Sequence, residues 1–370
     1  MSGHPWGGSE VLWSRAALSL SAAGHEVHAF VKDWEHTPEP IMRLAESGIF
    51  IHKKRNRKTG RMARAWGLFR SMLGMKQSPH GSMAEMLSLC PDLVCISHGA
   101  IVCGLDWMLF CKEHHIPYTS IAHANSEAWW ANDEEIERIS SAYLGARNCF
   151  FVSRENLRLL ETQTARKFPN SRVVWNPVNV RRDVAYSWPA GEHALRLACV
   201  GRLEPSAKGQ DILLRVLATE KWRQRDIRIS FFGSGPNALS LKRLSVMLGV
   251  TTMVDFAGHT NDVERIWLEH HALILASRFE GLPLCLVEAM LCHRPAIVTD
   301  VAGNKEVLLD GVTGFIASAP TVLALDEALE RAWSARSNLA EFGKRASEHI
   351  RAIYPEDPAG EFCRILLNNS

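Results

Sequence analysis

The alternation of helix-like and strand-like segments along the whole chain restricts its fold more than any other feature. Strands are expected at 25–31, 93–97, 118–122, 149–152 and 172–175, and helices at 9–23, 101–115, 133–146 and 154–164. After a linker near residues 181–194 the alternation restarts, with strands expected at 195–200 and 227–232 and helices at 209–218 and 236–248. This alternation is typical of an α/β fold, in which helices cover both faces of doubly wound parallel sheets.

Length and composition agree with two such units. The chain has 370 residues, of which 46% are hydrophobic, enough to fill two cores. No apolar run is long enough to cross a bilayer, and the opening MSGHPWGGSE is polar and rich in glycine. We therefore expect a cytoplasmic protein without a signal peptide. The nine cysteines form no Cys-x-x-Cys pair, which favours reduced thiols over a disulfide frame or a zinc site.

The segment SRFEGLPLCLVEA, residues 277–289, carries the clearest chemical pattern. It follows a mostly apolar run at 271–276 that predicts a buried strand. Gly281 and Pro283 break the backbone, and residues 284–291 predict a helix. Because the first amides of a helix lack intrahelical partners, the start of this helix favours an anion such as a diphosphate.

Two carboxylates flank that helix start, Glu280 on the loop and Glu288 about one turn into the helix. Ionised carboxylates only accept hydrogen bonds, which suits sugar hydroxyls at Glu280 and ribose hydroxyls at Glu288. This Glu, seven residues, Glu pattern in a strand-loop-helix context resembles that of the retaining glycosyltransferases of family 4, also described as glycosyl transferases group 1.

Further segments strengthen the resemblance and follow the family's order. CVGRLEPSAKGQD, residues 199–211, is similar to the family's phosphate-binding element, and FFGSGP, DFAGHTND and PAIVTDVAGNKEVLLDGVTGF resemble its other donor-domain segments. The resemblance implies the GT-B fold, in which two Rossmann-like domains face each other across a cleft. We expect an acceptor-binding domain at 1–180, a nucleotide-sugar domain at 181–354, and a final helix at 355–370 that returns to the first domain.

Cations in the matched segments are candidates for stabilising the leaving group. Arg202 and Lys208 lie between a predicted strand and a predicted helix, where they would neutralise a departing diphosphate. The sequence has no Asp-x-Asp in a strand-loop context to hold a metal ion, so we expect no metal cofactor. The resemblance also implies substrate contacts from a wider set of residues: Gly7, Gly8, Gly233, Gly258, Ser277, Gly281, Leu282, Pro283, Leu284 and Glu288.

In the first half, polar and aromatic residues follow the predicted strands. His123 ends the strand at 118–122, and similar enzymes use a histidine there to contact the transferred sugar. His98 ends another strand and either lines the acceptor cleft or caps the backbone. Trp129 and Trp130 suit stacking on an acceptor sugar, although packing beneath a loop is the commoner role of such residues.

The two glycines of the Gly7-Gly8 loop have two interpretations. They let backbone amides approach the donor's phosphate or the acceptor, or they simply form a tight turn. Family members open with a buried strand before such a loop, whereas here Gly7 follows the initiator methionine closely. We expect either that the start was assigned downstream of the true one or that this chain is a variant without the strand.

Residues 52–76 contain many basic residues and no acidic one, with aromatic and aliphatic residues interleaved. This composition fits a basic amphipathic helix on the anionic inner face of the cytoplasmic membrane, or a solvated loop. Nucleic acid is not an expected partner.

The resemblance implies a retaining glycosyltransferase that moves a sugar from a UDP- or GDP-linked donor to a hydroxyl of an acceptor, which is a sugar or a lipid-linked sugar. The expected process is assembly of cell-surface polysaccharide or glycolipid. Two alternatives remain, a non-hydrolysing NDP-sugar epimerase and an inactive nucleotide-sugar-binding subunit.

Overall fold

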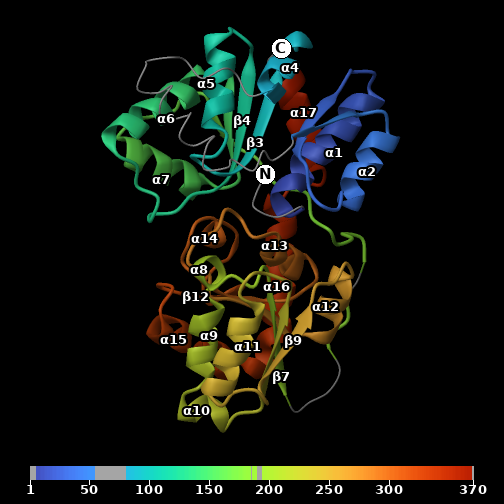
Figure 1. Cartoon of the computed structure of the whole chain (residues 1–370). Helices are drawn as coiled ribbons and strands as arrows, with labels where there is room; N and C mark the ends of the chain where they lie inside the picture. The colour runs from blue at the N-terminus through green and yellow to red at the C-terminus, as the bar shows by residue number, and fades with distance from the viewer. Residues whose placement is uncertain (1–5, 55–80, 185, 190–193, 369–370) are drawn as a thin grey trace.

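The protein folds into two α/β domains, which Figure 1 shows one above the other. The structure, a computed structural model, describes residues 6–54, 81–184, 186–189 and 194–368. The upper domain is built from the first half of the chain, and the lower domain from most of the second half. The basic segment at 52–76 lies outside the described residues except for residues 52–54 at the end of a strand. Among the described residues, no helix is long and apolar enough to cross a membrane.

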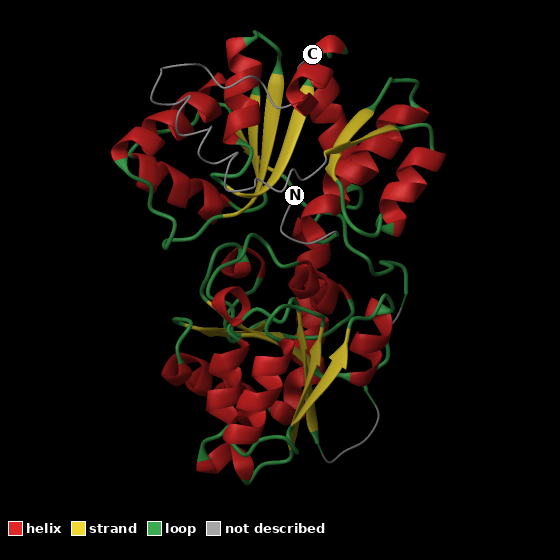
Figure 2. Ribbon diagram, in the orientation of Figure 1, coloured by secondary structure: helices red, strands yellow, loops and turns green. Residues whose placement is uncertain are grey.

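The N-terminal domain alternates helices with short parallel strands. The strands of its described residues form a two-stranded sheet, β1-β2, and a four-stranded sheet in the order β3-β4-β5-β6 (Figure 2). In chain order the elements are α1 (Gly8–Ala22), β1 (His28–Lys32), α2 (Glu39–Glu46), β2 (Phe50–Lys54), α4 (Gly81–Ser88), β3 (Val94–Ala100), α5 (Leu105–Glu113), β4 (Tyr118–Ala124), α6 (Asp133–Gly145), β5 (Asn148–Phe151), α7 (Arg154–Thr164) and β6 (Ser171–Val173).

The C-terminal domain contains one parallel sheet of six strands in the order β12-β11-β10-β7-β8-β9, with helices on both faces (Figure 2). Its strands are β7 (Leu195–Val200), β8 (Ile227–Phe232), β9 (Val254–Gly258), β10 (Ala272–Leu275), β11 (Ala296–Thr299) and β12 (Gly314–Ala317). Its helices are α8 (Pro205–Lys208), α9 (Gln210–Leu217), α10 (Glu220–Arg223), α11 (Ala238–Met247), α12 (Val263–Glu269), α13 (Leu284–Leu291), α14 (Asn304–Val307), α15 (Val322–Ser334), the 3-10 turn η1 (Arg336–Asn338) and α16 (Leu339–Ile353).

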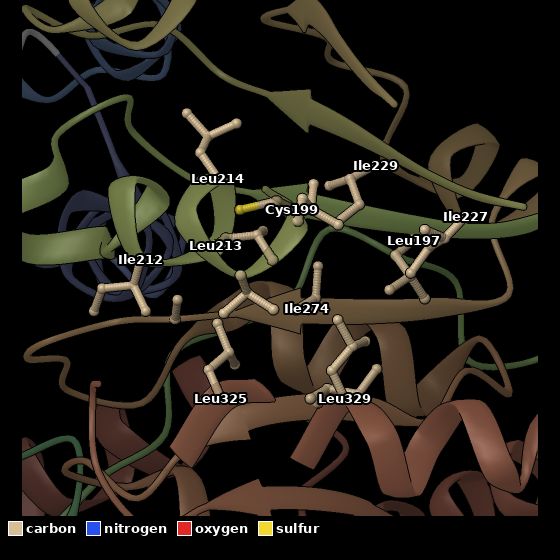
Figure 3. Close-up of a cluster of buried hydrophobic side chains, with 14 of the residues drawn as sticks. Leu197, Cys199, Ile212, Leu213, Leu214, Ile227, Ile229, Ile274, Leu325 and Leu329 are labelled. Atoms are coloured by element: carbon tan, nitrogen blue, oxygen red, sulfur yellow. The ribbon is translucent and has the colours of Figure 1, made fainter. Parts of the chain in front are cut away.

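The core of the C-terminal domain forms because its central strands are apolar on both faces. Every residue of β10 and β11 is buried, as a strand covered on two sides by helices requires. Figure 3 shows part of this core, where side chains of β7, β8 and β10 meet those of α9 and α15. The strand order places β7 and β10 at the centre of the sheet, so the loops that follow them open at the same edge.

Local signals explain where several helices begin. The hydroxyl of Ser153 accepts a hydrogen bond from the Asn156 amide, which caps α7 as its sequence position predicts. The helix expected at 101–115 is shorter, because Gly104 adopts a left-handed φ of 84° and α5 begins only after it.

The last helix, α17 (Pro358–Asn368), packs on the N-terminal domain beside α1 (Figure 1). Phe362 is buried against Phe150 of β5 in an edge-to-face contact with ring centroids 5.0 Å apart. The chain thus ends on the domain where it started.

Truncation of Phe362 should destabilise the N-terminal domain. Phe362→Ala removes a buried aromatic ring, and we expect it to lower the free energy of unfolding by about 3–5 kcal/mol in denaturant titration. Leu323→Ala, at a leucine of α15 that is 80% exposed, is the control and should change it by less than about 0.5 kcal/mol. Similar effects of the two substitutions would contradict this packing role.

Candidate functional site

A cluster of polar side chains lies at the carboxyl edge of the C-terminal sheet, in the loop between β10 and α13. One carboxylate oxygen of Glu280 accepts hydrogen bonds from Lys208 Nζ at 2.5 Å and from Ser277 Oγ at 2.8 Å. Glu280 is only 6% exposed and Ser277 is fully buried, so the ion pair is held in a fixed geometry. The structure therefore brings together three of the residues expected from sequence.

The backbone around Lys208 is held against the same loop. Gly209, between α8 and α9, has a left-handed φ of 62°, and a Cβ there would lie 1.8 Å from the carbonyl oxygen of Ala276. Only glycine permits both the conformation and this approach. The lysine is thereby fixed beside the end of β10.

Arg278, which sequence reasoning did not single out, ties the two loops together. Its guanidinium binds both carboxylate oxygens of Asp211 in α9, at 2.7 and 2.8 Å, and also donates to the Pro205 carbonyl. Burial alone would raise the pKa of Asp211, but the hydrogen bonds and charge of Arg278 lower it. The partners lie far apart in sequence, so no local pattern identifies the pair.

Arg202 forms its ion pair outside the Lys208–Ser277–Glu280 cluster. Its guanidinium forms an ion pair with Glu204 at 2.8 Å, and its side chain is 41% exposed. Two of the expected glycines lie nearby, Gly233 just after β8 and Gly258 at the end of β9, and the Gly233 amide donates to the Gly258 carbonyl at 2.7 Å. Both glycines lie at the carboxyl ends of parallel strands, at the same edge of the sheet as Lys208.

Glu288 is buried in α13, and one of its carboxylate oxygens accepts two hydrogen bonds from Asn179 in the segment between the domains. The Asn179 amide lies at 3.0 Å and its side-chain nitrogen at 3.1 Å. Burial raises the pKa of the Glu288 carboxyl, and the hydrogen bonds from Asn179 oppose this shift. Sequence reasoning assigned Glu288 to a ribose and did not foresee its contact with Asn179.

Two buried histidines lie at strand ends of the N-terminal domain. His123 Nε2 is 3.1 Å from Ser97 Oγ, and His98 Nδ1 donates to the Ala100 carbonyl at 2.8 Å. Among the described residues, His123 Nδ1 and His98 Nε2 have no hydrogen-bond partner. Burial lowers the pKa of His98 to about 4 and that of His123 to about 3, so both rings are neutral at neutral pH.

The two domains touch through the candidate site. A Cβ on Gly281 would lie 2.0 Å from the His123 carbonyl oxygen and 2.6 Å from a methyl group of Val152, so only glycine fits. Gly8 lies against Leu284, where a Cβ would be 3.1 Å from the leucine side chain. The loop that carries Glu280 therefore lies directly beneath the strand end that carries His123.

Further contacts cross the same boundary. Trp129 meets Phe279 edge-to-face, with ring centroids 4.9 Å apart, whereas Trp130 is 60% exposed. Glu306 of α14 accepts hydrogen bonds from the amides of Arg154 and Glu155 at the start of α7, at 3.1 and 2.9 Å. A carboxylate is favourable at a helix start because it interacts with the positive end of the helix dipole. No sequence pattern indicated that Glu306 caps a helix of the other domain.

The remaining expected contacts lie around the start of α13. Leu282 is buried in the C-terminal core, and Pro283 is the N-cap residue of α13, which has no side-chain cap. Gly7 is the N-cap residue of α1 in an extended conformation. The structure thus gathers most of the expected residues near the interdomain boundary, while Arg202 and Gly233 belong to adjoining loops and Gly258 ends β9.

Among the described residues, the site contains no group of potential metal ligands, and a cavity between β1 and β3 is centred elsewhere. In the part of the chain that the structure describes, no three His, Cys, Asp or Glu side chains are grouped to hold a metal ion. This cavity between β1 and β3 has a volume of about 1570 Å³ and includes Ser97 and His98 in its lining. We locate the site by its converging polar side chains, since the walls of that cavity are mostly those of a domain core.

Comparison with known proteins bears on the fold of the chain and on its C-terminal domain. Residues 194–335 match the family model described as "Glycosyl transferases group 1". A structure of HepE from Anabaena in complex with UDP-glucose superposes with a TM-score of 0.76 at 16% identity, covering 100% of this chain and 98% of that one. The galactosyltransferase WaaB of the lipopolysaccharide outer core, in its apo form, gives 0.67 at 18% identity, with coverage of 99% and 97%. The chain has the GT-B fold.

Curated relatives match over shorter segments of the chain. The Vi polysaccharide biosynthesis protein VipC/TviE of Salmonella typhi is 31% identical over 121 residues, 31% of this chain and 21% of that protein. A GDP-mannose-dependent mannosyltransferase that acts on phosphatidylinositol monomannoside, from Mycolicibacterium smegmatis, is 31% identical over 145 residues, 36% and 37% of the two chains. The match thus spans well under two thirds of either relative.

A side chain at residue 281 should be incompatible with the contact between the two domains. Gly281→Ala would place a Cβ 2.0 Å from the His123 carbonyl, so we expect the domains to separate and the radius of gyration from small-angle X-ray scattering to rise. Gly81→Ala is the matched control, because a Cβ there meets nothing within 4 Å. An unchanged radius for Gly281→Ala would refute the contact.

The buried histidines should make the fold sensitive to acid. Their pKa values of about 4 and about 3 lie below the usual 6.5, so the unfolded chain binds these protons at higher pH than the folded chain does. The free energy of unfolding should therefore fall as pH drops from about 6.5 towards 4, by up to about 1.4 kcal/mol per pH unit for each histidine. Denaturant titrations at about pH 5 and 8 measure this difference. The double variant His98→Gln, His123→Gln should reduce it, and an undiminished difference would contradict the assignment.

Proposed function

We propose that the protein is a retaining glycosyltransferase. It transfers a sugar from a UDP- or GDP-linked donor to a hydroxyl of a sugar or lipid-linked acceptor, in the assembly of cell-surface polysaccharide or glycolipid. The observation that carries the proposal is the hydrogen-bonded group formed by the half-buried Lys208 and the buried Ser277 and Glu280, which lies beneath His123 across the domain boundary. This arrangement offers a cation for a diphosphate beside a carboxylate for a polyol.

The comparisons support this class of reaction. The matched family model covers the domain that contains Lys208 and Glu280, and the HepE structures contain UDP and UDP-glucose. The name of the mycobacterial relative specifies a GDP-mannose donor, and that of the Salmonella relative a polysaccharide product. We take the donor to be a nucleotide-sugar of one of these two kinds.

The leaving diphosphate is stabilised by cations in this proposal. The Lys208 ammonium has three hydrogens, so it can donate to a phosphate oxygen and keep its hydrogen bond to Glu280. Arg202, on the adjoining loop, can turn from Glu204 to the second phosphate, because it is partly exposed. The amides at the uncapped start of α13 add partial positive charge. We therefore propose that no metal cofactor is needed.

The sugar lies between Glu280 and His123. The free oxygen of Glu280 accepts from sugar hydroxyls, and the neutral His123 ring has one unpartnered nitrogen among the described residues. The bond from the anomeric carbon to the diphosphate breaks and the acceptor oxygen bonds to that carbon on the same face. The acceptor proton passes to a phosphate oxygen. Contact between the domains limits access of water to this step.

Loss of the lysine should slow transfer strongly without unfolding the protein. Lys208→Ala should lower kcat by about 10²–10³-fold with UDP- or GDP-sugar donors, because one donor to the developing charge is lost. Glu280→Ala and Arg202→Ala should also slow turnover, through loss of sugar and phosphate contacts. Lys344→Ala, at an exposed lysine of α16 in the same domain, is the matched control and should leave the rate unchanged.

Mass analysis of the products distinguishes this reaction from the alternatives. A glycosylated acceptor and free nucleoside diphosphate support transfer. A changed sugar on an intact donor would show an epimerase, and binding without turnover would show a binding subunit. Rates like those of the unmodified protein in all three alanine variants would overturn the assigned site.

A further inference from the structure

The start of α7 in the N-terminal domain obtains its hydrogen-bond acceptors from both domains. The first amides of a helix have no partner within the helix. The amides of Arg154 and Glu155, the first two residues of α7, donate to the two carboxylate oxygens of Glu306, at 3.1 and 2.9 Å. The third amide, that of Asn156, donates to the hydroxyl of Ser153. The first three amides of α7 therefore all have protein acceptors only while the C-terminal domain is in contact.

On the side of the N-terminal domain, the start of α7 is joined to the strand end that carries His123. α7 follows β5, and β5 pairs with β4 in parallel register, with Phe151 opposite Ala122. The next residues of the two strands are Val152 and His123, so His123 and the start of α7 lie at the same edge of the sheet. Because paired strands move together, a displacement of α7 would displace His123 as well.

On the side of the C-terminal domain, Glu306 is joined to the loop that carries Glu280. Glu306 belongs to the short helix α14, whose N-cap residue is Gly303. The Gly303 amide donates to the Gly281 carbonyl at 2.9 Å, and a Cβ on Gly303 would lie 2.9 Å from the Cβ of Ser153. Figure 1 shows α14 on the side of the lower domain that is turned towards the upper one. Glu306 thus connects the Glu280 loop with the start of α7.

This contact differs in kind from the one at Gly281. The absence of a side chain at Gly281 permits a close approach of the domains but supplies no directional attraction. Hydrogen bonds from amides to a carboxylate are directional, and the positive end of the helix dipole strengthens them. Glu306 is half-buried, so water can replace both hydrogen bonds when the domains separate. The contact therefore suits a closure that forms and opens in each catalytic cycle.

We propose that Glu306 is a positioning residue for sugar transfer, because it holds α7, and with it His123, over the Glu280 loop when the domains close. The inference rests on the proposed function. Glu306 acts through the backbone of α7 and not through the donor or the acceptor. Without its carboxylate the donor still binds to the C-terminal domain, but the closed arrangement forms less often. The anomeric carbon then bonds more often to a water oxygen instead of the acceptor oxygen.

A pair of substitutions at residue 154 separates the amide from the side chain. Arg154→Pro removes the amide hydrogen at the first position of α7, where proline is favoured. Ser153 already has the extended backbone, φ −151° and ψ 154°, that a following proline requires. Arg154→Ala is the matched control, because it removes the same side chain and keeps the amide. We expect Arg154→Pro to have a kcat for transfer about tenfold lower than Arg154→Ala, with similar KM values for the donor.

Substitutions at Glu306 test the other end of the contact. Glu306→Ala should lower kcat for transfer by about tenfold to a hundredfold, and should raise the ratio of donor hydrolysis to transfer. Glu306→Gln keeps the length of the side chain and one oxygen acceptor, so it should recover part of the rate. The double variant Glu306→Ala, Arg154→Pro should be no slower than Glu306→Ala alone, because the removed amide has no carboxylate left to lose.

Hydrogen exchange supplies a measurement that needs no activity. The Glu155 amide should exchange at least about tenfold faster in Glu306→Ala than in the unmodified chain, since its acceptor is lost. The thermal midpoint and far-UV circular dichroism show whether Arg154→Pro is folded, and the Glu306 variants test the inference if it is not.

Unchanged transfer and hydrolysis in Glu306→Ala would overturn the inference. Equal rates of Arg154→Pro and Arg154→Ala, both folded, would also overturn it, as would effects of Glu306→Ala and Arg154→Pro that multiply in the double variant. Failure of the proposed function is distinguishable from these outcomes, because the unmodified chain would then transfer no sugar at all.

Discussion

The contact between the backbone of Gly281 and the carbonyl of His123 determines how the two halves of the molecule meet. A single Cβ at this position would lie within 2.0 Å of a main-chain atom that cannot move without its strand. Because the contact is made by backbone, it positions the Glu280 loop independently of any side-chain rotamer. Ser277 and Lys208 then fix the carboxylate from below, and Arg278 fixes the loop to α9. Preorganisation of this kind lowers the ordering cost when a ligand binds.

The sequence predicted those parts of the fold that depend on local pattern. β7, β8 and α13 occupy the residues expected, because a buried parallel strand is continuously apolar and a helix start has a recognisable turn before it. Ser153 likewise caps α7 through a hydrogen bond to the third residue after it. The GT-B fold was foreseen through the resemblance of motifs in the second half of the chain.

Interactions between distant segments were not predictable in this way. Arg278 and Asp211 lie 67 positions apart, and Glu306 and Arg154 lie 152 apart, so a charge at one position says nothing about its partner at the other. The separation of β1 from β3 was also not foreseen, although the absence of a strand before Gly7 was an expectation. Pairing of parallel strands depends on tertiary contacts that one sequence does not encode locally.

The hydrogen bonds from Asn179 to Glu288 have a consequence for any study of movement between the domains. Asn179 belongs to the connecting segment, whereas Glu288 belongs to the helix whose first turn faces the proposed diphosphate. A replacement of Asn179 leaves a buried carboxyl without its partners and shifts its protonation towards the neutral acid. Kinetic changes in such a variant would therefore combine altered hinge motion with altered charge beside the nucleotide. A variant at Val178, which has no part in these hydrogen bonds, separates the two effects.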